Sequence, residues 1–430
     1  MDNVEREMTL AEEYNQQGRV LYSLDKYEES IKEYQKAEKE DPMLIQTYLN
    51  LSESYIMLDQ YDDAKKALKR AQLVDKSNGE VYFHFGNIAL LEDNIEEAKQ
   101  NFAKSISFGY KNPYIYLNLG TTYEEMGELD EAMLNYNKAI QMDKYFDSAW
   151  LKKLELLLSL EQYSEGLSVC EDMIDLLPDR FEGYHYKIAI LMELGKQAEA
   201  KAALDHALDL YPDDPGFKMD KVHYLASTGK YEEAEKLLDR DFSNDPDAED
   251  YAKLKVQLML QQEKTEEAVE LAEKSLDEKF DEELNFLLTN IYMAGEQYAQ
   301  AIASTERTLK ENNESLYYYS ALYFNALAHK KNGEDATEYF ANANKKFRMA
   351  CSGNPGVIDL YIYRALCYKE LKNYDRAYEM VDYILAINEN APEALLIRSE
   401  INKDLGKMAE YEADRKEALK QNPNLERIIM

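Results

Sequence analysis

The chain has 430 residues, of which 45% are hydrophobic and 11% aromatic, a composition that supports a packed core and argues against disorder. Its 50 basic and 84 acidic residues give a net charge of −34, which disfavours nucleic acids and anionic membranes as partners. A basic partner would be attracted, although the acidity also serves to keep a large chain soluble.

The first ten residues, MDNVEREMTL, are expected to be a short lead-in. They have neither the basic nor the apolar region of a secretory signal, and no apolar run in the chain approaches the length of a membrane span. The three cysteines, Cys170, Cys351 and Cys367, are odd in number and form no CxxC motif. This usage is typical of a reduced, intracellular protein, and we expect a cytoplasmic location.

An internal repeat begins near residue 11. Residues 25–42 and 59–76 align at a spacing of 34, and the same spacing continues along the chain. Such a period predicts stacked helical hairpins in place of separate globular domains. The predicted repeats begin near residues 11, 45, 79, 113, 147, 181, 215, 249, 282, 316, 358 and 392.

Each repeat is predicted to contain two helices, A and B. Helix A carries apolar or small residues at helical spacing, as at Tyr116, Leu119, Gly120 and Tyr123. The turn that follows often has glycine at one position: Gly127, Gly195, Gly229 and Gly406. Helix B begins with a small residue, such as Ala132, and a large residue follows four positions later.

Proline placement gives an independent test of this register. Proline breaks helix interiors but is accepted in linkers and in the first turn of a helix. All nine prolines fall at junctions between predicted repeats, and none falls inside a predicted helix: Pro42, Pro113, Pro178, Pro212, Pro215, Pro246, Pro355, Pro392 and Pro423.

The pattern resembles the tetratricopeptide repeat family over roughly residues 11–425. The fourth repeat carries the signature closely, at Tyr116, Leu119, Gly120, Tyr123, Ala132, Tyr136 and Ala139. The resemblance implies an all-α, right-handed superhelical solenoid of about twelve helix-turn-helix repeats. We therefore expect one solenoid over residues 11–425, preceded by the lead-in 1–10 and followed by a cap at 426–430.

Two places depart from the period. The tenth repeat, residues 316–357, has 42 residues and holds the tyrosine-rich segment LYYYSALYFN. This elongation is either a tolerated insertion with longer helices or loop, or a contact patch for a partner. At the end of the chain, Leu425, Ile428, Ile429 and Met430 are expected to seal the last helix pair.

No catalytic or metal-binding motif is found, so we expect a non-enzymatic chain without cofactor or metal. Ser227 and Lys230 match an SxxK string, but the companion motifs of that enzyme class are missing. The acidic segment 243–250 lacks EF-hand spacing. His84, His185 and His223 lie in different repeats, too far apart to converge on one ion.

In this family helix A lines the concave groove, at about positions 2, 5, 6, 9, 12 and 13 of each repeat. At those positions of repeats one to nine, acids outnumber bases. Apolar residues crowd repeats two to five, which suggests a groove for an apolar or basic peptide, unless some of these side chains pack against the next repeat. The predicted groove residues are Leu49, Glu53, Ile56, Glu80, Phe83, Leu90, Tyr114, Leu117, Glu124 and Glu125.

One variant of the family holds the acidic tails of the Hsp70 and Hsp90 chaperones in a clamp of lysine, asparagine and arginine side chains. The corresponding positions here hold Asn15, Arg19, Asn50, Glu80 and His84, or, two repeats later, Phe83, Asn87, Asn118, Ser148 and Lys152. The asparagines partly match, but the lysines that would neutralise a carboxylate are missing, so this role is disfavoured.

The leading hypothesis is therefore a scaffold or adaptor that binds a protein segment in its concave groove. Two alternatives remain. One is a regulatory peptide sensor, which would lack a DNA-binding domain of its own because only about ten residues precede the first repeat. The other is an assembly or recruitment factor of a multiprotein complex, in which any enzyme would be a separate chain.

Overall fold

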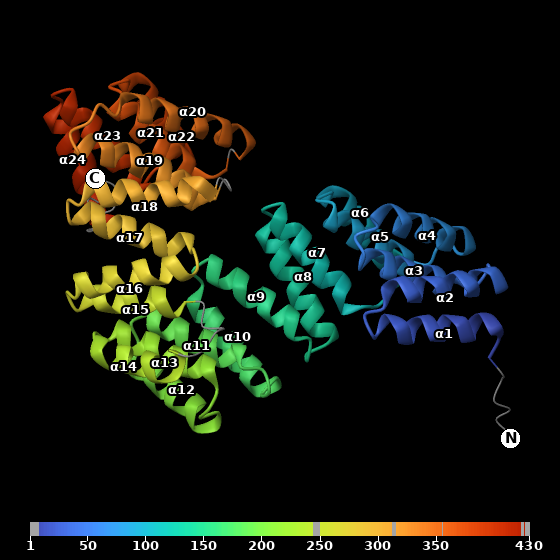
Figure 1. Cartoon of the computed structure of the whole chain (residues 1–430). Helices are drawn as coiled ribbons and strands as arrows, with labels where there is room; N and C mark the ends of the chain where they lie inside the picture. Colours follow the sequence, from blue (N-terminus) through green and yellow to red (C-terminus); the bar gives the residue numbers. More distant parts are fainter. Residues whose placement is uncertain (1–7, 244–249, 312–314, 355, 423–424, 426–430) are drawn as a thin grey trace. The chain divides into compact units, whose positions relative to one another are not determined.

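The structure is a computed structural model that describes residues 8–243, 250–311, 315–354, 356–422 and 425 (Figure 1). These residues form twenty-four α-helices and contain no β-strand. The helices follow one another as twelve helix-turn-helix pairs, which confirms the predicted all-α class and the number of repeats. The handedness of the superhelix stays a prediction.

The chain divides into two compact units, residues 1–224 and 225–430, with the boundary inside helix α13 (Pro215–Ser227). The units are described separately, and a single solenoid over 11–425 stays a prediction. Every predicted repeat begins within two residues of the observed start of a helix A.

Unit 1 contains helices α1 to α12 and most of α13. Their bounds are α1 Leu10–Tyr22, α2 Tyr27–Glu40, α3 Ile45–Ile56, α4 Tyr61–Val74, α5 Gly79–Leu91, α6 Ile95–Ser107, α7 Pro113–Glu125, α8 Leu129–Met142, α9 Asp147–Ser159, α10 Tyr163–Leu176, α11 Glu182–Glu193 and α12 Gln197–Leu210.

Unit 2 contains the end of α13 and helices α14 to α24. Their bounds are α14 Tyr231–Phe242, α15 Tyr251–Gln261, α16 Thr265–Glu278, α17 Glu282–Ala294, α18 Tyr298–Glu311, α19 Leu316–Lys331, α20 Thr337–Gly353, α21 Ile358–Glu370, α22 Tyr374–Ile387, α23 Pro392–Asp404 and α24 Met408–Gln421.

Small residues bring the two helices of a repeat together. Gly86 of α5 faces the ring of Phe102 on α6, and a Cβ atom at position 86 would lie 2.5 Å from that ring. The alanine that opens helix B, such as Ala98 or Ala132, is fully buried. The predicted role of small residues in close helix packing is thus confirmed, since interiors leave no room for added methyl groups.

The turn inside each repeat uses a left-handed backbone conformation. All twelve turns contain a residue with φ between 55° and 84°. Glycine fills this position in five repeats, including the predicted Gly127, Gly195, Gly229 and Gly406. In the other seven the residue is an aspartate, a glutamate or a lysine, although side chains other than glycine disfavour this region.

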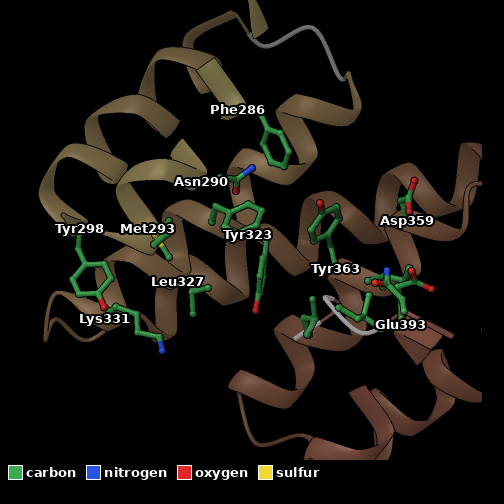
Figure 2. Close-up of a pocket in the computed structure, with 16 residues that line it drawn as sticks. Phe286, Asn290, Met293, Tyr298, Tyr323, Leu327, Lys331, Asp359, Tyr363 and Glu393 are labelled. Carbon is green, nitrogen blue, oxygen red and sulfur yellow. The ribbon is translucent and has the colours of Figure 1, made fainter. Parts of the chain in front are cut away.

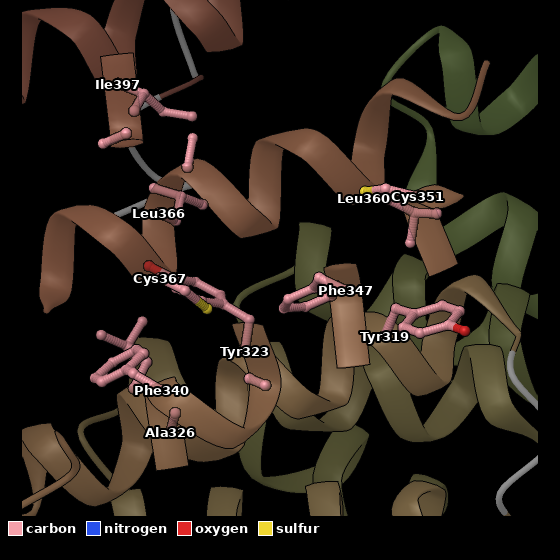
Figure 3. Close-up of a cluster of buried hydrophobic side chains, with 14 of the residues drawn as sticks. Tyr319, Tyr323, Ala326, Phe340, Phe347, Cys351, Leu360, Leu366, Cys367 and Ile397 are labelled. Atoms are coloured by element: carbon pink, nitrogen blue, oxygen red, sulfur yellow. The ribbon is translucent and has the colours of Figure 1, made fainter. Parts of the chain in front are cut away.

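The elongated tenth repeat owes its length to both of its helices. Helix α19 has 16 residues and α20 has 17, whereas every other helix of the described chain has 11 to 14. Tyr318, Tyr319 and Tyr323 of α19 are buried in the core of unit 2, where they pack with Phe340 and Phe347 of α20 (Figure 3). Most of the tyrosine-rich segment is therefore core, and not an exposed contact patch.

The helix ends agree with the proline prediction wherever the structure describes them. Pro113, Pro215 and Pro392 are each the first residue of a helix A. Pro246, Pro355, Pro423, Ile428, Ile429 and Met430, and with them the predicted cap at 426–430, lie outside the described residues, whereas Leu425 is buried. The three cysteines are free and buried.

Candidate functional site

The predicted groove in repeats two to five lies in unit 1, and three of its apolar residues are not exposed. Leu49, Phe83 and Leu117 are only 1%, 7% and 9% exposed and belong to hydrophobic clusters of the core. The ring centroid of Phe83 lies 5.8 Å from that of Tyr110 and 6.2 Å from that of Phe102. The prediction that these three form an open strip was wrong, because each packs into a hydrophobic cluster with side chains of neighbouring helices.

The other apolar residues of the predicted groove are more accessible. Ile56 and Leu90 are half-buried against the same clusters. Tyr114 is 50% exposed, and its ring centroid lies 4.5 Å from that of Phe146. These residues are separate accessible points beside a closed core, and their use as a binding surface stays a prediction.

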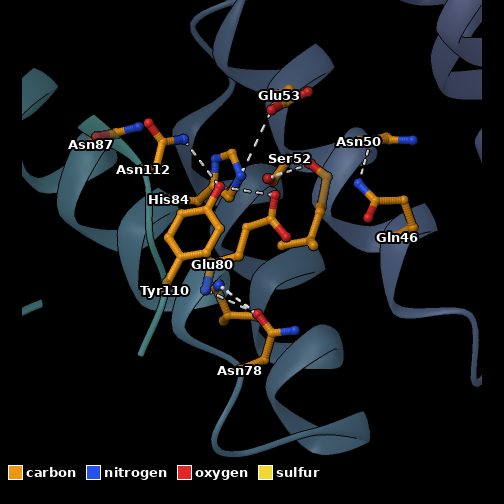
Figure 4. Close-up of polar contacts among 12 residues, drawn as sticks. Gln46, Asn50, Ser52, Glu53, Asn78, Glu80, His84, Asn87, Tyr110 and Asn112 are labelled. Atoms are coloured by element: carbon orange, nitrogen blue, oxygen red, sulfur yellow. Dashed lines mark hydrogen bonds and ion pairs between the residues drawn. The ribbon is translucent and has the colours of Figure 1, made fainter. Parts of the chain in front are cut away.

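Two of the predicted acids, Glu53 and Glu80, belong to a polar cluster between α3 and α5 (Figure 4). A Glu53 carboxylate oxygen lies 3.7 Å from Nε2 of the buried His84, and the Tyr110 hydroxyl donates a 3.2 Å hydrogen bond to Glu80. Burial and the neighbouring Glu80 raise the pKa of Glu53, and burial lowers the pKa of His84 to about 4. His84 is therefore neutral at pH 7 and adds no positive charge beside Glu53, whose pKa Arg19 lowers in part.

The remaining acids differ in exposure. Glu124 accepts a 2.6 Å hydrogen bond from the buried Tyr136, whereas Glu125 is exposed. Asparagine side chains of successive A helices are also hydrogen-bonded. Asn50 donates to Asn15 at 3.1 Å, and Asn118 donates to Asn87 at 2.8 Å. The asparagines at the clamp positions therefore satisfy one another within the chain.

A well-formed cavity lies in unit 2, away from the predicted groove. It has a volume of about 500 Å³ and lies between α17, α19, α21 and α23, the A helices of repeats nine to twelve (Figure 2). We call it the unit 2 pocket. Its apolar lining residues are Phe286, Met293, Ala294, Tyr323, Phe324, Leu327, Ile362, Tyr363, Leu366 and Leu425.

Aromatic rings build the floor of the unit 2 pocket. Tyr323 is 3% exposed, and its ring centroid lies 5.7 Å from that of Tyr363 and 5.6 Å from that of Phe324. Phe286 of α17 packs edge-on against Phe324 at 5.7 Å. Because these side chains stand on packed helices, the floor of the pocket is preformed, as is usual for ligand sites.

Polar groups lie around the apolar floor. Lys331 and Tyr298 stand at one end of the view in Figure 2, and Asp359 and Glu393 at the other. Lys331 lies in the last turn of α19. This helix has 16 residues, whereas the other A helices have 11 to 13 and are therefore about one turn shorter. The extra length of repeat ten thus supplies one end of the pocket.

A smaller cavity of about 200 Å³ adjoins the unit 2 pocket and shares Tyr323, Leu327, Lys331 and Leu366 with it. Its other charged residues include Lys330 and Lys369, which both contact the Glu370 carboxylate. The Oε1 atom of the buried Glu400 has no hydrogen bond there. Across the described residues, no three His, Cys, Asp or Glu side chains are grouped so as to hold a metal ion.

Sequence models of one family match the chain at several places. The tetratricopeptide repeat models match residues 191–258 and, separately, 45–78 and 113–146, and a TPR repeat model matches 18–59. The match at 113–146 begins with α7 and contains the α7–α8 pair. The chain is a tetratricopeptide repeat protein. Proteins with these repeats mediate protein–protein interactions, and the family is typically non-catalytic.

Solved structures that are similar to parts or most of this chain include two described as tetratricopeptide repeat proteins. One from Parabacteroides merdae is 16% identical, covers 58% of this chain and 98% of its own, and has a TM-score of 0.47. YrrB, described as having an unusual peptide-binding site, is 20% identical over 44% of this chain and 97% of its own, at a TM-score of 0.35. The Cut9–Hcn1 assembly is 12% identical, covers 98% of this chain and 97% of its own, and has a TM-score of 0.38.

No curated protein sequence matches this tetratricopeptide repeat chain. Among the helices of the described residues, none combines the length and apolar character needed to cross a membrane.

The unit 2 pocket carries a sequence signal that becomes clear only when the groove positions are followed beyond repeat nine. The groove positions of helix A, continued into repeat eleven, fall on Asp359, Ile362, Tyr363 and Leu366, which all line the pocket. In repeat nine the same positions include Phe286, Asn290, Met293 and Ala294. Extending the comparison to the last repeats would have found this site.

Proposed function

We propose that this protein is a non-enzymatic scaffold that holds a segment of another protein in the unit 2 pocket. One observation carries the proposal: helices A of four successive repeats converge on a cavity of about 500 Å³ whose floor is aromatic and aliphatic. Cavities of this size with apolar walls and a few polar groups are the usual form of a ligand site.

The chemistry of the lining favours a peptide with a bulky apolar side chain. The Tyr323 and Tyr363 rings and the Leu327 side chain offer apolar surface, and no described cluster of metal ligands accompanies them. An aromatic or aliphatic anchor buried in such a pocket contributes about 2 kcal/mol or more to binding. The pocket therefore suits the anchor of a protein segment.

A pocket-filling substitution tests this directly. Ala294 is exposed at the end of α17 and lines the pocket, so Ala294→Trp should block the cavity without disturbing the core. Ala341 is exposed on α20 outside the pocket lining, and Ala341→Trp is the matched control. Random peptides displayed on phage should be enriched for apolar anchors by the wild type and by Ala341→Trp.

The outcome of this selection decides the proposal. Peptides selected on the wild type should lose about thirtyfold or more in affinity for Ala294→Trp, which corresponds to the loss of one anchor of about 2 kcal/mol. Equal affinity for Ala294→Trp would contradict the proposal, and so would a failure to enrich any peptide with an apolar anchor.

A second surface is proposed on unit 1 for a basic segment. Glu53, Glu80 and the exposed Glu125 lie on its helices A, and the raised pKa of Glu53 reflects burial and the neighbouring carboxylate. A cationic group placed there would relieve that repulsion. Replacing Glu124 and Glu125 by lysine should slow association with a basic peptide and reduce the salt dependence of its rate. An unchanged association rate would argue against this surface.

A further inference from the structure

The two ends of the unit 2 pocket carry opposite charges that form no ion pairs with the described residues of the protein. Lys331 lies at one end, and Asp359 and Glu393 lie at the other (Figure 2). Within the described parts of the chain, none of these three side chains forms an ion pair. All three therefore remain available to a ligand.

The charges next to the pocket behave differently. Lys330 precedes Lys331 in the chain and pairs with Glu370, whose carboxylate also lies 3.5 Å from Lys369. These three residues line the adjoining 200 Å³ cavity but not the unit 2 pocket. These three residues are thus paired with one another, whereas the charged residues that line the unit 2 pocket are not.

The Tyr323 hydroxyl gives an independent sign that a ligand belongs here. The Tyr363 hydroxyl is hydrogen-bonded to Ser320 at 2.9 Å, whereas that of Tyr323 has no hydrogen-bond partner among the described residues. Burial, and to a smaller extent the charge of Glu370, raises the pKa of Tyr323, so its O–H group stays protonated. Because Tyr323 lines the pocket, its hydroxyl can donate a hydrogen bond to an acceptor on a ligand.

The spacing along α19 sets the scale of the ligand. Tyr323, Leu327 and Lys331 are four residues apart and share one face of the helix. The rise of an α-helix places the first and last of them roughly 12 Å apart. An extended peptide spans that distance in about four residues.

Resting on the function proposed above, we propose that the segment held in the unit 2 pocket is dipolar. Its apolar centre lies on Tyr323, Leu327 and Tyr363. An acidic group about four residues away pairs with Lys331, and a basic group on the other side pairs with Asp359 and Glu393. The Tyr323 hydroxyl donates a hydrogen bond to an oxygen of the segment.

The same charges also have a role within their helices. Asp359 and Glu393 lie in the first turns of α21 and α23, and Lys331 lies in the last turn of α19. At these positions the charge of each side chain interacts favourably with the dipole of its helix. If that were their only role, neutralising them would change thermal stability without changing which peptide binds. The test separates the two roles.

Four short peptides with one common apolar centre serve as probes. The flanks are acidic and basic in the dipolar peptide, both basic in the second, both acidic in the third and neutral in the fourth. The full-length wild type is compared with Lys331→Met and with the double variant Asp359→Asn, Glu393→Gln. Lys330→Met is the matched control, because Lys330 is already paired with Glu370.

The wild type should bind the dipolar peptide at least about fivefold more tightly than the doubly basic one, despite the net charge of −34. Lys331→Met should lose this preference, and the double variant should gain affinity for the doubly acidic peptide. Lys330→Met should retain the wild-type order. A wild type that binds the doubly basic peptide best, or a Lys331→Met variant that keeps the preference, would overturn the proposal.

The remaining outcomes are also distinct. If all four peptides bind alike and all are lost on Ala294→Trp, the pocket binds apolar segments but the dipolar proposal fails. If no peptide responds to Ala294→Trp, the proposed function itself fails. Self-association that Ala294→Trp abolishes would assign the pocket to a second copy of the chain and overturn the proposal.

Discussion

Gly120 of α7 lies so close to the ring of Tyr136 on α8 that a Cβ atom at position 120 would be 2.5 Å from the ring carbon Cε1. Tyr136 is fully buried, so its ring cannot move aside without disturbing the core. This contact fixes the distance between the two helices of repeat four, and Gly86 and Phe102 form the same contact one repeat earlier.

Replacing Gly120 by alanine should therefore destabilise repeat four by about 2 kcal/mol, the usual effect of overpacking a core. Gly353, at the end of α20, is the control, because nothing lies within 4 Å of a Cβ atom built there. Hydrogen exchange of α7 and α8 measures the effect. Unchanged exchange in Gly120→Ala would show that these helices are not held at the observed distance.

Replacing Phe83 should lower stability without changing peptide binding. Because it is buried in the core, Phe83→Ala should destabilise α5 and α6 by about 3 kcal/mol. It should leave peptide binding by the unit 2 pocket unchanged. Tyr114→Ala, at a half-exposed position, is the control and should change stability little. Weaker peptide binding with normal helix protection would instead place Phe83 in a binding site.

The repeat period and the placement of prolines were sufficient to predict the helices, because both depend on local spacing. Exposure within helix A was not predictable in the same way. Leu49 and Phe83 occupy the same position of their repeats as Phe286 and Ile362, yet the first two are core and the last two line a cavity. The difference depends on which side chains of neighbouring helices pack beside them.

The unit 2 pocket was missed for a second physical reason. Tyr323 and Lys331 do not fall on the groove positions of the regular repeat, because α19 is longer than the other A helices. The length of repeat ten was visible in the sequence, but it did not indicate whether helix or loop had grown. Only the packing of α19 and α20 shows that the tyrosines turn inward and the lysine lies at the pocket.

The turns inside the repeats allow a prediction about backbone strain. Glu161 has φ of 57° and is exposed, so Glu161→Gly should stabilise its repeat by up to about 1 kcal/mol. Gly195 has φ of 66° and open space around it, so Gly195→Ala should destabilise by a similar amount. Melting temperatures measure both. Shifts in the same direction for the two variants would contradict the left-handed turn.

The His84 imidazole should make stability depend on pH. Its pKa is about 4 in the folded chain because it is buried, whereas in the unfolded chain it is about 6.5. As pH falls from 6.5 towards 4, the unfolded state takes up a proton that the folded state does not, so stability falls by up to roughly 3 kcal/mol. The raised pKa of Glu53 acts in the opposite sense in the acidic range.

Comparing the wild type with His84→Gln isolates the histidine contribution. The difference in unfolding free energy between the two proteins should change between pH 7 and pH 4, and the variant should lose less stability. Urea unfolding at each pH gives this difference. A constant difference across the range would mean that His84 is not buried in the neutral form.

The central claim is that the unit 2 pocket, and not the apolar positions of the predicted groove in unit 1, holds the apolar anchor of the partner segment. Photoreactive benzoylphenylalanine placed at Phe286 tests the pocket, and the same group at Tyr114 tests the predicted groove. A peptide selected on the wild type should crosslink to the chain that carries the group at position 286 and not to the one that carries it at position 114. Crosslinking at 114 alone would contradict the account.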